Sequence, residues 1–176
     1  MDKEELKRSY INMKNGDRAA CERIYNELKT PVYVIALRYT KDRYKAEDIV
    51  HDVFVKLFNS GEGNVYVENP RAWIFRMARN LAIDCLRERR ADSLDDDDNS
   101  EGQSLQYESD DYETASERLD TENALCRLPK DELEIVTLRV NGELKFIEIS
   151  AVTGLPEGTV YSKYRSGISH LKALMS

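Results

Sequence analysis

Apolar residues recur every three or four positions through most of the chain, and this spacing predicts amphipathic helices. Asn15, Gly16 and Asp17 end one predicted helix and begin the next, with Gly16 at the break and Asp17 as the N-cap. The helical pattern continues over 17–40, where Pro31 should kink or divide the helix. Alternation of period two never persists long enough to indicate a strand, so the pattern predicts an all-α protein.

Further helical patterns follow on both sides of a polar middle segment. A stretch with glycines, 59–70, predicts a loop before the helix at 69–90. The helix beginning at Pro129 has acids in its first turn and Gly142 at its end. These patterns predict helices over 45–60, 69–90, 129–142, 145–154 and 156–175.

The formal charge of −7 over 176 residues is concentrated in one segment. Residues 91–126 hold one arginine and 13 acids, whereas 1–90 carries a net +4 and 127–176 a net +1. A segment this acidic and poor in aliphatic residues buries too little surface to offset its ordering entropy. We therefore expect two small helical domains, a bundle over 1–90 and a helix-turn-helix over 127–176, joined by a flexible acidic linker over 91–126. A spacer with no further role is the alternative for this linker.

The remaining composition excludes several classes of protein. Apolar runs stay far below the roughly 20 residues of a membrane span, and the first residues do not form a signal peptide, so we expect no membrane insertion. Three widely spaced cysteines, Cys21, Cys85 and Cys126, lack metal-ligand spacing and suit reduced thiols in the cytoplasm. We expect no catalytic centre, metal or cofactor, because the chain has two histidines, no glycine-rich phosphate loop and no nucleophile–base pair.

The stretch "NPRAWIFRMARNLAIDCLRERR", from Asn69 to Arg90, separates into two faces at 100° per residue. Arg76, Asn80 and Arg87 share one stripe, with Trp73 at its border. Arginines attract phosphate, an asparagine can pair with a base edge, and an exposed aromatic ring can stack on an unpaired base. This combination suits DNA whose strands are separating; the alternative is a solvated basic face with Trp73 in the core. The opposite face is apolar: Ile74, Phe75, Met77, Ala78, Leu81, Ala82, Cys85 and Leu86.

The stretch "AEDIVHDVFVKLF" places Asp48, His51 and Asp52 on one outward stripe. Two acids one turn apart repel each other unless a cation lies opposite them. A basic partner helix would supply that cation, whereas the alternative is an ordinary acidic surface with His51 as a solvated residue. The inward stripe is apolar and consists of Ile49, Val50, Val53, Phe54 and Leu57.

The last two predicted helices have the layout of a helix-turn-helix, with a turn at Gly154 and Pro156. Generic helical hairpins can imitate this layout. Inward positions of the last helix are Val160, Tyr164, Ile168 and Leu171. Outward positions available to DNA are Thr159, Tyr161, Ser162, Lys163, Arg165 and Ser166.

The order of these parts resembles the extracytoplasmic-function sigma factors of bacterial RNA polymerase. The likeness is carried by "AEDIVHDVFVKLF", then "NPRAWIFRMARNLAIDCLRERR", an acidic linker, and "LPKDELEIVTLRVNGELKFIEISAVTGLPEGTVYSKYRSGISHLKAL". Where the family usually has Gln and Trp, this chain has His51 and Phe58, and its last helix has few basic residues.

The resemblance implies a factor that binds core RNA polymerase, directs it to promoters and nucleates promoter melting. Asp48, His51 and Asp52 would bind the β′ clamp helices, and the loop 60–69, with Asn64, would capture a flipped base of the −10 element. The helix with Trp73, Arg76, Asn80 and Arg87 would open the duplex, while the helix-turn-helix would read the −35 element and touch the β flap. An anti-sigma factor is a further partner of many relatives. The alternatives are a stand-alone helix-turn-helix regulator and an interaction module that has lost DNA binding.

Overall fold

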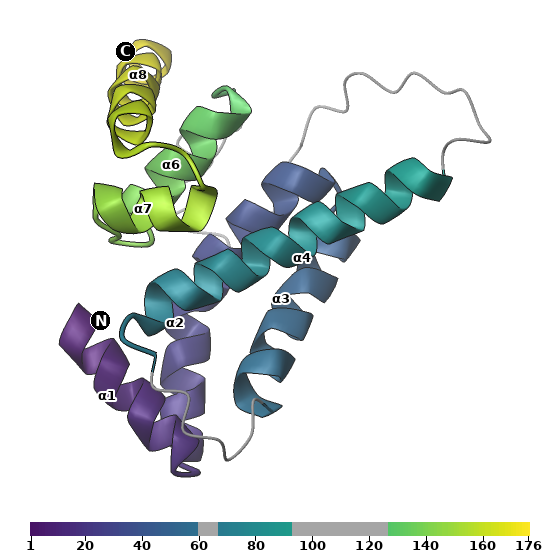
Figure 1. Ribbon diagram of the computed structural model, residues 1–176, viewed down its shortest axis with the longest axis vertical. Helices are drawn as coiled ribbons and strands as arrows, with labels where there is room; N and C mark the ends of the chain where they lie inside the picture. Colours follow the sequence, from purple (N-terminus) through teal and green to yellow (C-terminus); the bar gives the residue numbers. More distant parts are fainter. Residues whose placement is uncertain (60–66, 93–126) are drawn as a thin grey trace.

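The computed structural model describes residues 1–59, 67–92 and 127–176, and every regular element in these ranges is an α-helix (Figure 1). The predicted all-α class is therefore confirmed. Helices before the acidic segment are α1 (Lys3–Lys14), α2 (Arg18–Thr40), α3 (Arg43–Asn59) and α4 (Pro70–Asp92). Helices after it are α6 (Lys130–Val140), α7 (Phe146–Thr153) and α8 (Glu157–Met175). We call these two sets the N-terminal group and the C-terminal group.

The turn between α1 and α2 has the capping that the sequence predicts. Gly16 has φ +88°, a left-handed conformation that glycine adopts at no steric cost. Asp17 Oδ1 accepts hydrogen bonds from the backbone N–H groups of Ala19 at 2.9 Å and Ala20 at 3.2 Å. The Asp17 side chain thereby satisfies donors that the first turn of α2 leaves without intrahelical partners.

Helix α2 runs without a break from Arg18 to Thr40, so Pro31 does not divide it. Pro31 removes one intrahelical hydrogen bond, but it is buried beside Leu28, Val32 and Ile35, which are themselves almost fully buried. Tertiary packing on this scale outweighs the local preference of proline, because most helix stability in proteins comes from the buried face.

Helix α2 is the central element of the N-terminal group and contacts α1, α3 and α4. Its residues Ile24, Leu28 and Ile35 are fully buried, as are Leu57 of α3 and Phe75 of α4. The short α1 completes this packing with Leu6, Tyr10 and Met13. Helices α3 and α4 also pack on each other, so the two predicted functional helices are held in a fixed relation.

The C-terminal group contains the predicted helix-turn-helix. Helix α7 ends at Gly154, whose φ of +76° makes the turn, and α8 begins after Pro156. Helix α8 packs on α6 at Gly167, where an added Cβ would lie 2.9 Å from Val136 Cγ2. Glycine inside a helix costs roughly 1 kcal/mol relative to alanine, and here it permits a close approach of the two helices.

The two groups pack directly against each other rather than lying apart. Helix α2 contacts α6, and α4 contacts α7 (Figure 1). At this boundary Phe75 is fully buried, and a Cβ added at Gly142 would lie 2.9 Å from its Cε2 atom. Most of the predicted linker, residues 93–126, lies outside the described residues, while its first two residues extend α4.

The Gly167→Ala variant should lower the free energy of unfolding by about 1–2 kcal/mol, since the new methyl group collides with Val136 and Glu132. Urea or thermal unfolding measures the change. Gly158→Ala is the control in the same helix, because no atom lies within 4 Å of its added Cβ; it should be neutral or slightly stabilising. A Gly167→Ala protein as stable as the wild type would contradict this account of the α6–α8 contact.

Candidate functional site

The acidic stripe of α3 lies where the sequence places it. Asp48, His51 and Asp52 are exposed, and the opposite stripe of the helix is buried. Asp48 and Asp52 are one helical turn apart, so their two negative charges repel each other. The surface therefore presents negative charge ready to pair with a basic partner.

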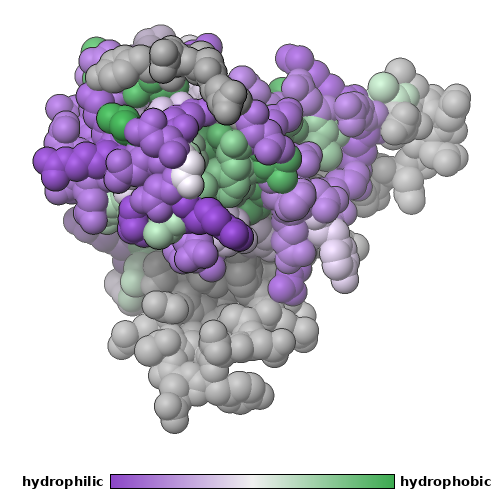
Figure 2. Space-filling view, turned by 90° about the horizontal axis from the view of Figure 1, so that it is seen from below, coloured by the Kyte–Doolittle hydropathy of each residue, from purple (hydrophilic) through white to green (hydrophobic). Residues whose placement is uncertain are grey.

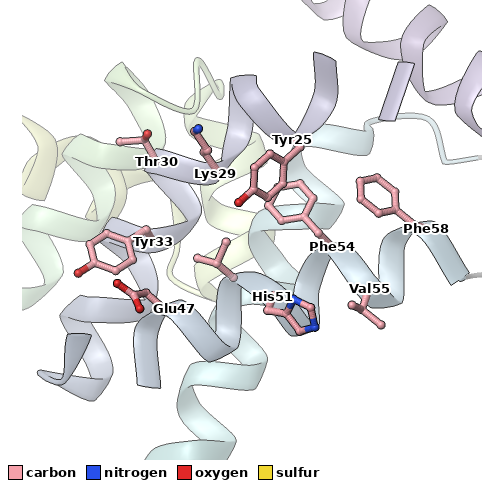
Figure 3. Close-up of a pocket in the computed structure, with 10 residues that line it drawn as sticks. Tyr25, Lys29, Thr30, Tyr33, Glu47, His51, Phe54, Val55 and Phe58 are labelled. Atoms are coloured by element: carbon pink, nitrogen blue, oxygen red, sulfur yellow. The ribbon is translucent and has the colours of Figure 1, made fainter. Parts of the chain in front are cut away.

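A groove of about 570 Å³ runs between α2 and α3 beside this stripe (Figure 3). His51 belongs to both features, because it lines the groove and lies on the acidic stripe. The sequence pattern predicted the acidic stripe of α3 but not the groove, whose α2 side consists of Tyr25, Lys29, Thr30 and Tyr33. Val55 and Phe58 are apolar residues at outward positions of α3, and this pattern in the sequence could have indicated an apolar groove beside the stripe.

Aromatic packing shapes one end of this groove. Tyr25 meets Phe54 edge to face with ring centroids 4.9 Å apart, and the Phe54 and Phe58 centroids lie 5.9 Å apart. Tyr25 and Phe58 stay 39% and 40% exposed, so apolar area reaches solvent here. Figure 2 shows apolar surface gathered in the middle of one face of the molecule and surrounded by polar side chains. An apolar groove beside acids suits a partner helix that is both apolar and basic.

Helix α4 has the two faces that its periodicity predicts. Arg76, Asn80 and Arg87 are exposed, and the Arg87 side chain has only a loose 3.7 Å ion pair with Asp84. The predicted Asn64 lies outside the described residues. Ile74, Phe75, Ala78 and Ala82 are fully buried, and Met77, Leu81, Cys85 and Leu86 are half-buried.

The sequence left two alternatives for Trp73, an exposed ring at the border of the basic stripe or a ring in the core, and the structure places it between them. It is half-buried, and its ring meets Tyr10 of α1 edge to face with centroids 6.4 Å apart. The indole therefore belongs in part to the core and in part to the border of the basic stripe. Such packing holds the aromatic ring in one orientation.

Arg71 is a structural residue that the sequence analysis missed. It is buried, and its guanidinium donates to the carbonyl oxygens of Met1 at 2.7 Å and Gly142 at 3.2 Å. It also pairs with Glu27 at 3.2 Å and Glu143 at 3.3 Å. Arg71 therefore joins α2, α4 and the turn after α6.

A second cluster joins the two groups around Glu134 of α6. Its Oε1 atom accepts from Arg79 Nε at 3.1 Å and the Tyr39 hydroxyl at 2.9 Å, and its Oε2 atom lies 3.0 Å from Arg38 Nη1. Arg38 also donates to the carbonyl of Lys130. Burial, followed by the Glu134 charge, raises the pKa of Tyr39 to about 12, so its hydroxyl stays a donor.

The predicted DNA-facing residues of α8 divide into two sets. Tyr161, Ser162 and Arg165 are exposed, and the Arg165 guanidinium lies 6.0 Å from the Tyr161 ring centroid. Other members are turned inward: Thr159 is half-buried, Lys163 Nζ lies 3.1 Å from Asp131, and Ser166 donates to Glu132 at 2.7 Å.

Glu132 of α6 is buried against α8. Its Oε2 atom lies 2.7 Å from His170 Nδ1. Burial raises the pKa of Glu132, but the hydrogen bonds from His170 and Ser166 outweigh that effect and hold the pKa below its ordinary value. Glu132 therefore remains a carboxylate that fixes the register of α8 on α6.

Two features of the described residues bear on other classes of site. No cluster of three or more His, Cys, Asp or Glu side chains there has the arrangement of a metal site. Within the same ranges, no helix combines the length and the apolar character needed to cross a bilayer.

Two protein-family models match the chain: "Sigma-70 region 2" over residues 24–91 and "Sigma-70, region 4" over residues 118–171. The ECF RNA polymerase sigma factor RpoE of Cereibacter sphaeroides is 32% identical over 74% of this chain and 70% of its own length. The chain belongs to the ECF sigma factors of RNA polymerase. As a sigma factor, it directs RNA polymerase to promoters; sigma factors are DNA-binding initiation factors and, in general, not enzymes.

Another relative and two solved structures resemble this sigma factor over most of its length. The ECF sigma factor SigW of Bacillus subtilis is 26% identical over 95% of both chains. RpoE from Bartonella quintana, solved with the anti-sigma factor NepR, has a TM-score of 0.66 at 24% identity, covering 84% of this chain and 91% of that one. CnrH, solved with the cytosolic domain of CnrY, has a TM-score of 0.59 at 20% identity over 96% of both chains. At these identities the two structures show a shared fold.

Two arginines of α4 should respond differently to substitution. Arg71→Ala removes a buried guanidinium together with its bonds to the Met1 and Gly142 carbonyls and its pair with Glu27, so it should cost about 3 kcal/mol of unfolding free energy. Arg76→Ala, on the exposed stripe of the same helix, is the matched control and should change stability by less than about 0.5 kcal/mol. Denaturant unfolding of both variants compares them, and equal losses would show that the exposed stripe is structural.

Proposed function

We propose that the two exposed helices of the N-terminal group divide the work of this sigma factor. Helix α3 binds core RNA polymerase, and α4 separates and holds the strands of the −10 element. The observation that supports this division is the outward pair of stripes, acidic on α3 and basic on α4, carried by helices that are fixed against each other. Opposite charges of this kind select different partners, because each surface attracts one and repels the other.

The α3 surface offers two kinds of contact to the β′ clamp helices. Asp48 and Asp52 can form charge-assisted hydrogen bonds with basic side chains. The neighbouring groove, with Tyr25 and Phe58, can receive apolar side chains of the same partner. His51 lies between these two parts and is a hydrogen-bonding group at the centre of the interface.

The α4 surface supplies energy for strand separation. Unstacking costs a few kcal/mol per base step, and contacts to the separated strand must offset it. Arg76 and Arg87 hold phosphates, Asn80 contacts a base edge, and Trp73 stacks at the border of the stripe. Asn64, in the preceding loop, is proposed to contact the flipped base.

The C-terminal group is proposed to read the −35 element through α8 and to touch the β flap. Tyr161, Ser162 and Arg165 form the exposed part of this surface, with Thr159, Lys163 and Ser166 beside it. Lys163 and Ser166 already bind acids of α6, so few free cations face the DNA. We therefore propose that −35 binding is weak without the polymerase.

We further propose that the protein acts in the cytoplasm by binding alone, without a catalytic centre, metal or cofactor. An anti-sigma factor is a proposed regulatory partner, since RpoE and CnrH were solved with NepR and CnrY. The stand-alone regulator is the weaker reading, because region 2 and region 4 both match in order. Gel shifts with and without core enzyme test the proposal: a sigma factor should bind promoter DNA strongly only with the enzyme.

The double variant Asp48→Ala, Asp52→Ala should weaken binding to core RNA polymerase about tenfold, or ~1.4 kcal/mol, since two charge-assisted contacts are lost. Competition against a labelled sigma factor measures this affinity. Glu4→Ala with Glu5→Ala removes the same charge from exposed positions of α1 and should leave the affinity unchanged. Unchanged competition by the α3 variant would refute the assignment of this surface.

Arg76→Ala and Asn80→Ala should each reduce open-complex formation about tenfold while binding to core enzyme is retained, because the lost contacts are made to separated strands. Permanganate reactivity of promoter thymines measures the melting. Arg18→Ala, at an exposed position of α2, is the control for loss of positive charge. If core binding falls in parallel with melting, α4 does not have the proposed role.

A further inference from the structure

The Glu134 carboxylate crosses the boundary between the two groups and fills an anion site built by the N-terminal group. Arg38, Tyr39 and Arg79 surround it, and both carboxylate oxygens are bound. The Glu134 side chain is 4% exposed and that of Arg38 is 6% exposed, so water screens these bonds little. Two guanidinium groups and a phenol are a donor set with which proteins hold carboxylates and phosphates alike.

This anion site adjoins the stripe that we assign to DNA. Arg79 follows Arg76 by three residues on α4, and residues at this spacing are neighbours on a helix surface. Arg76 is exposed, whereas Arg79 is 23% exposed and bound to Glu134. The C-terminal group therefore occupies a guanidinium that would otherwise extend the basic stripe of α4.

The closed arrangement is too compact to reach both promoter elements. Elements centred near −10 and −35 lie about 25 base pairs apart, or about 85 Å of B-DNA. Helix α4, with 23 residues, is about 35 Å long, and α7 packs directly on it. The two groups must therefore separate, and the 34 residues of 93–126 have a maximum reach of about 110 Å.

We propose that Arg38, Tyr39 and Arg79 form an oxyanion site that Glu134 occupies in the closed chain and a promoter backbone phosphate occupies after the groups separate. This inference rests on the proposed role of α4. When the groups separate, Arg38 and Arg79 lose the carboxylate that neutralises them, and a backbone phosphate offers the same negative charge and acceptor oxygens, so one donor set can serve both states. Glu134 then acts as an internal competitor that lowers the affinity of the free chain for DNA.

Two variants of the full chain disrupt the contact between Glu134 and Arg79 but should have opposite effects on the affinity for DNA. Glu134→Gln removes the competing charge and keeps the site, whereas Arg79→Ala damages the site itself. Glu143→Gln is the matched control, because Glu143 also pairs across the boundary, at 3.3 Å from Arg71, but lies outside the site. Small-angle scattering reports the separation of the groups, and circular dichroism confirms that each variant is folded.

Binding to a fluorescein-labelled (dT)12 oligonucleotide by anisotropy, over a range of salt concentrations, tests the site. Glu134→Gln should increase the radius of gyration, raise the affinity about fivefold, and steepen the log–log salt slope by about 0.7, the value for one single-strand phosphate. Arg79→Ala should also open the chain, but with an affinity at or below the wild type. The Glu143→Gln control should bind like the wild type.

Three results would overturn the proposal: no gain for Glu134→Gln, an equal gain for Arg79→Ala, or an equal gain for Glu143→Gln, which would reflect net charge alone. Opening of the wild-type chain by inorganic phosphate, compared with sodium chloride at equal ionic strength, would also overturn it in favour of a free-anion site. In vitro transcription by the wild type with core enzyme tests the proposed function separately. If transcription succeeds and the oligonucleotide pattern is absent, the anion site is wrong and the proposed function stands.

Discussion

Helix α4 is part of the core along one side and carries an exposed basic stripe along the other, and this constraint governs the rest of the structure. Its buried side, with Ile74 and Phe75, joins the N-terminal group and also meets the turn at Gly142. The 3.6-residue period then leaves Arg76 and Asn80 outward with no freedom to rotate inward. A stripe held in this way is pre-organised, so in the proposed role of α4 less binding energy would be lost to ordering it on DNA.

Three arginines on this one helix have different physical roles because their surroundings differ. Arg71 is buried, so breaking its ion pairs would leave an uncompensated charge inside the protein. Arg76 is exposed, where ion pairs contribute little to stability and the guanidinium remains available to a ligand. Arg79 lies between these limits and is bound by a carboxylate from the other group. Position on the helix, rather than residue type, decides which arginine stabilises the fold.

The boundary between the two groups contains several polar contacts, which suits the opening that we propose. Lys3 and Asn69 both reach Glu148, at 2.7 and 2.8 Å, and Arg38 and Arg79 both reach Glu134. Charged groups regain hydration when such a boundary separates, so the cost of opening is smaller than for an apolar interface of equal size. In the proposed opening, polymerase and DNA would shift the population toward the open state by binding it preferentially.

The sequence by itself determined the helices, the inward and outward faces of α3 and α4, and the helix-turn-helix, because these depend on periodicity and capping within a few residues. Asp48 and Arg76 are exposed as the pattern predicted. Only the tertiary structure decided that Pro31 lies inside one continuous helix and that Glu134 meets Arg79, 55 residues away in sequence. The same holds for the α2 side of the groove. Contacts of this range depend on how whole helices pack, and no local pattern of polar and apolar positions contains that information.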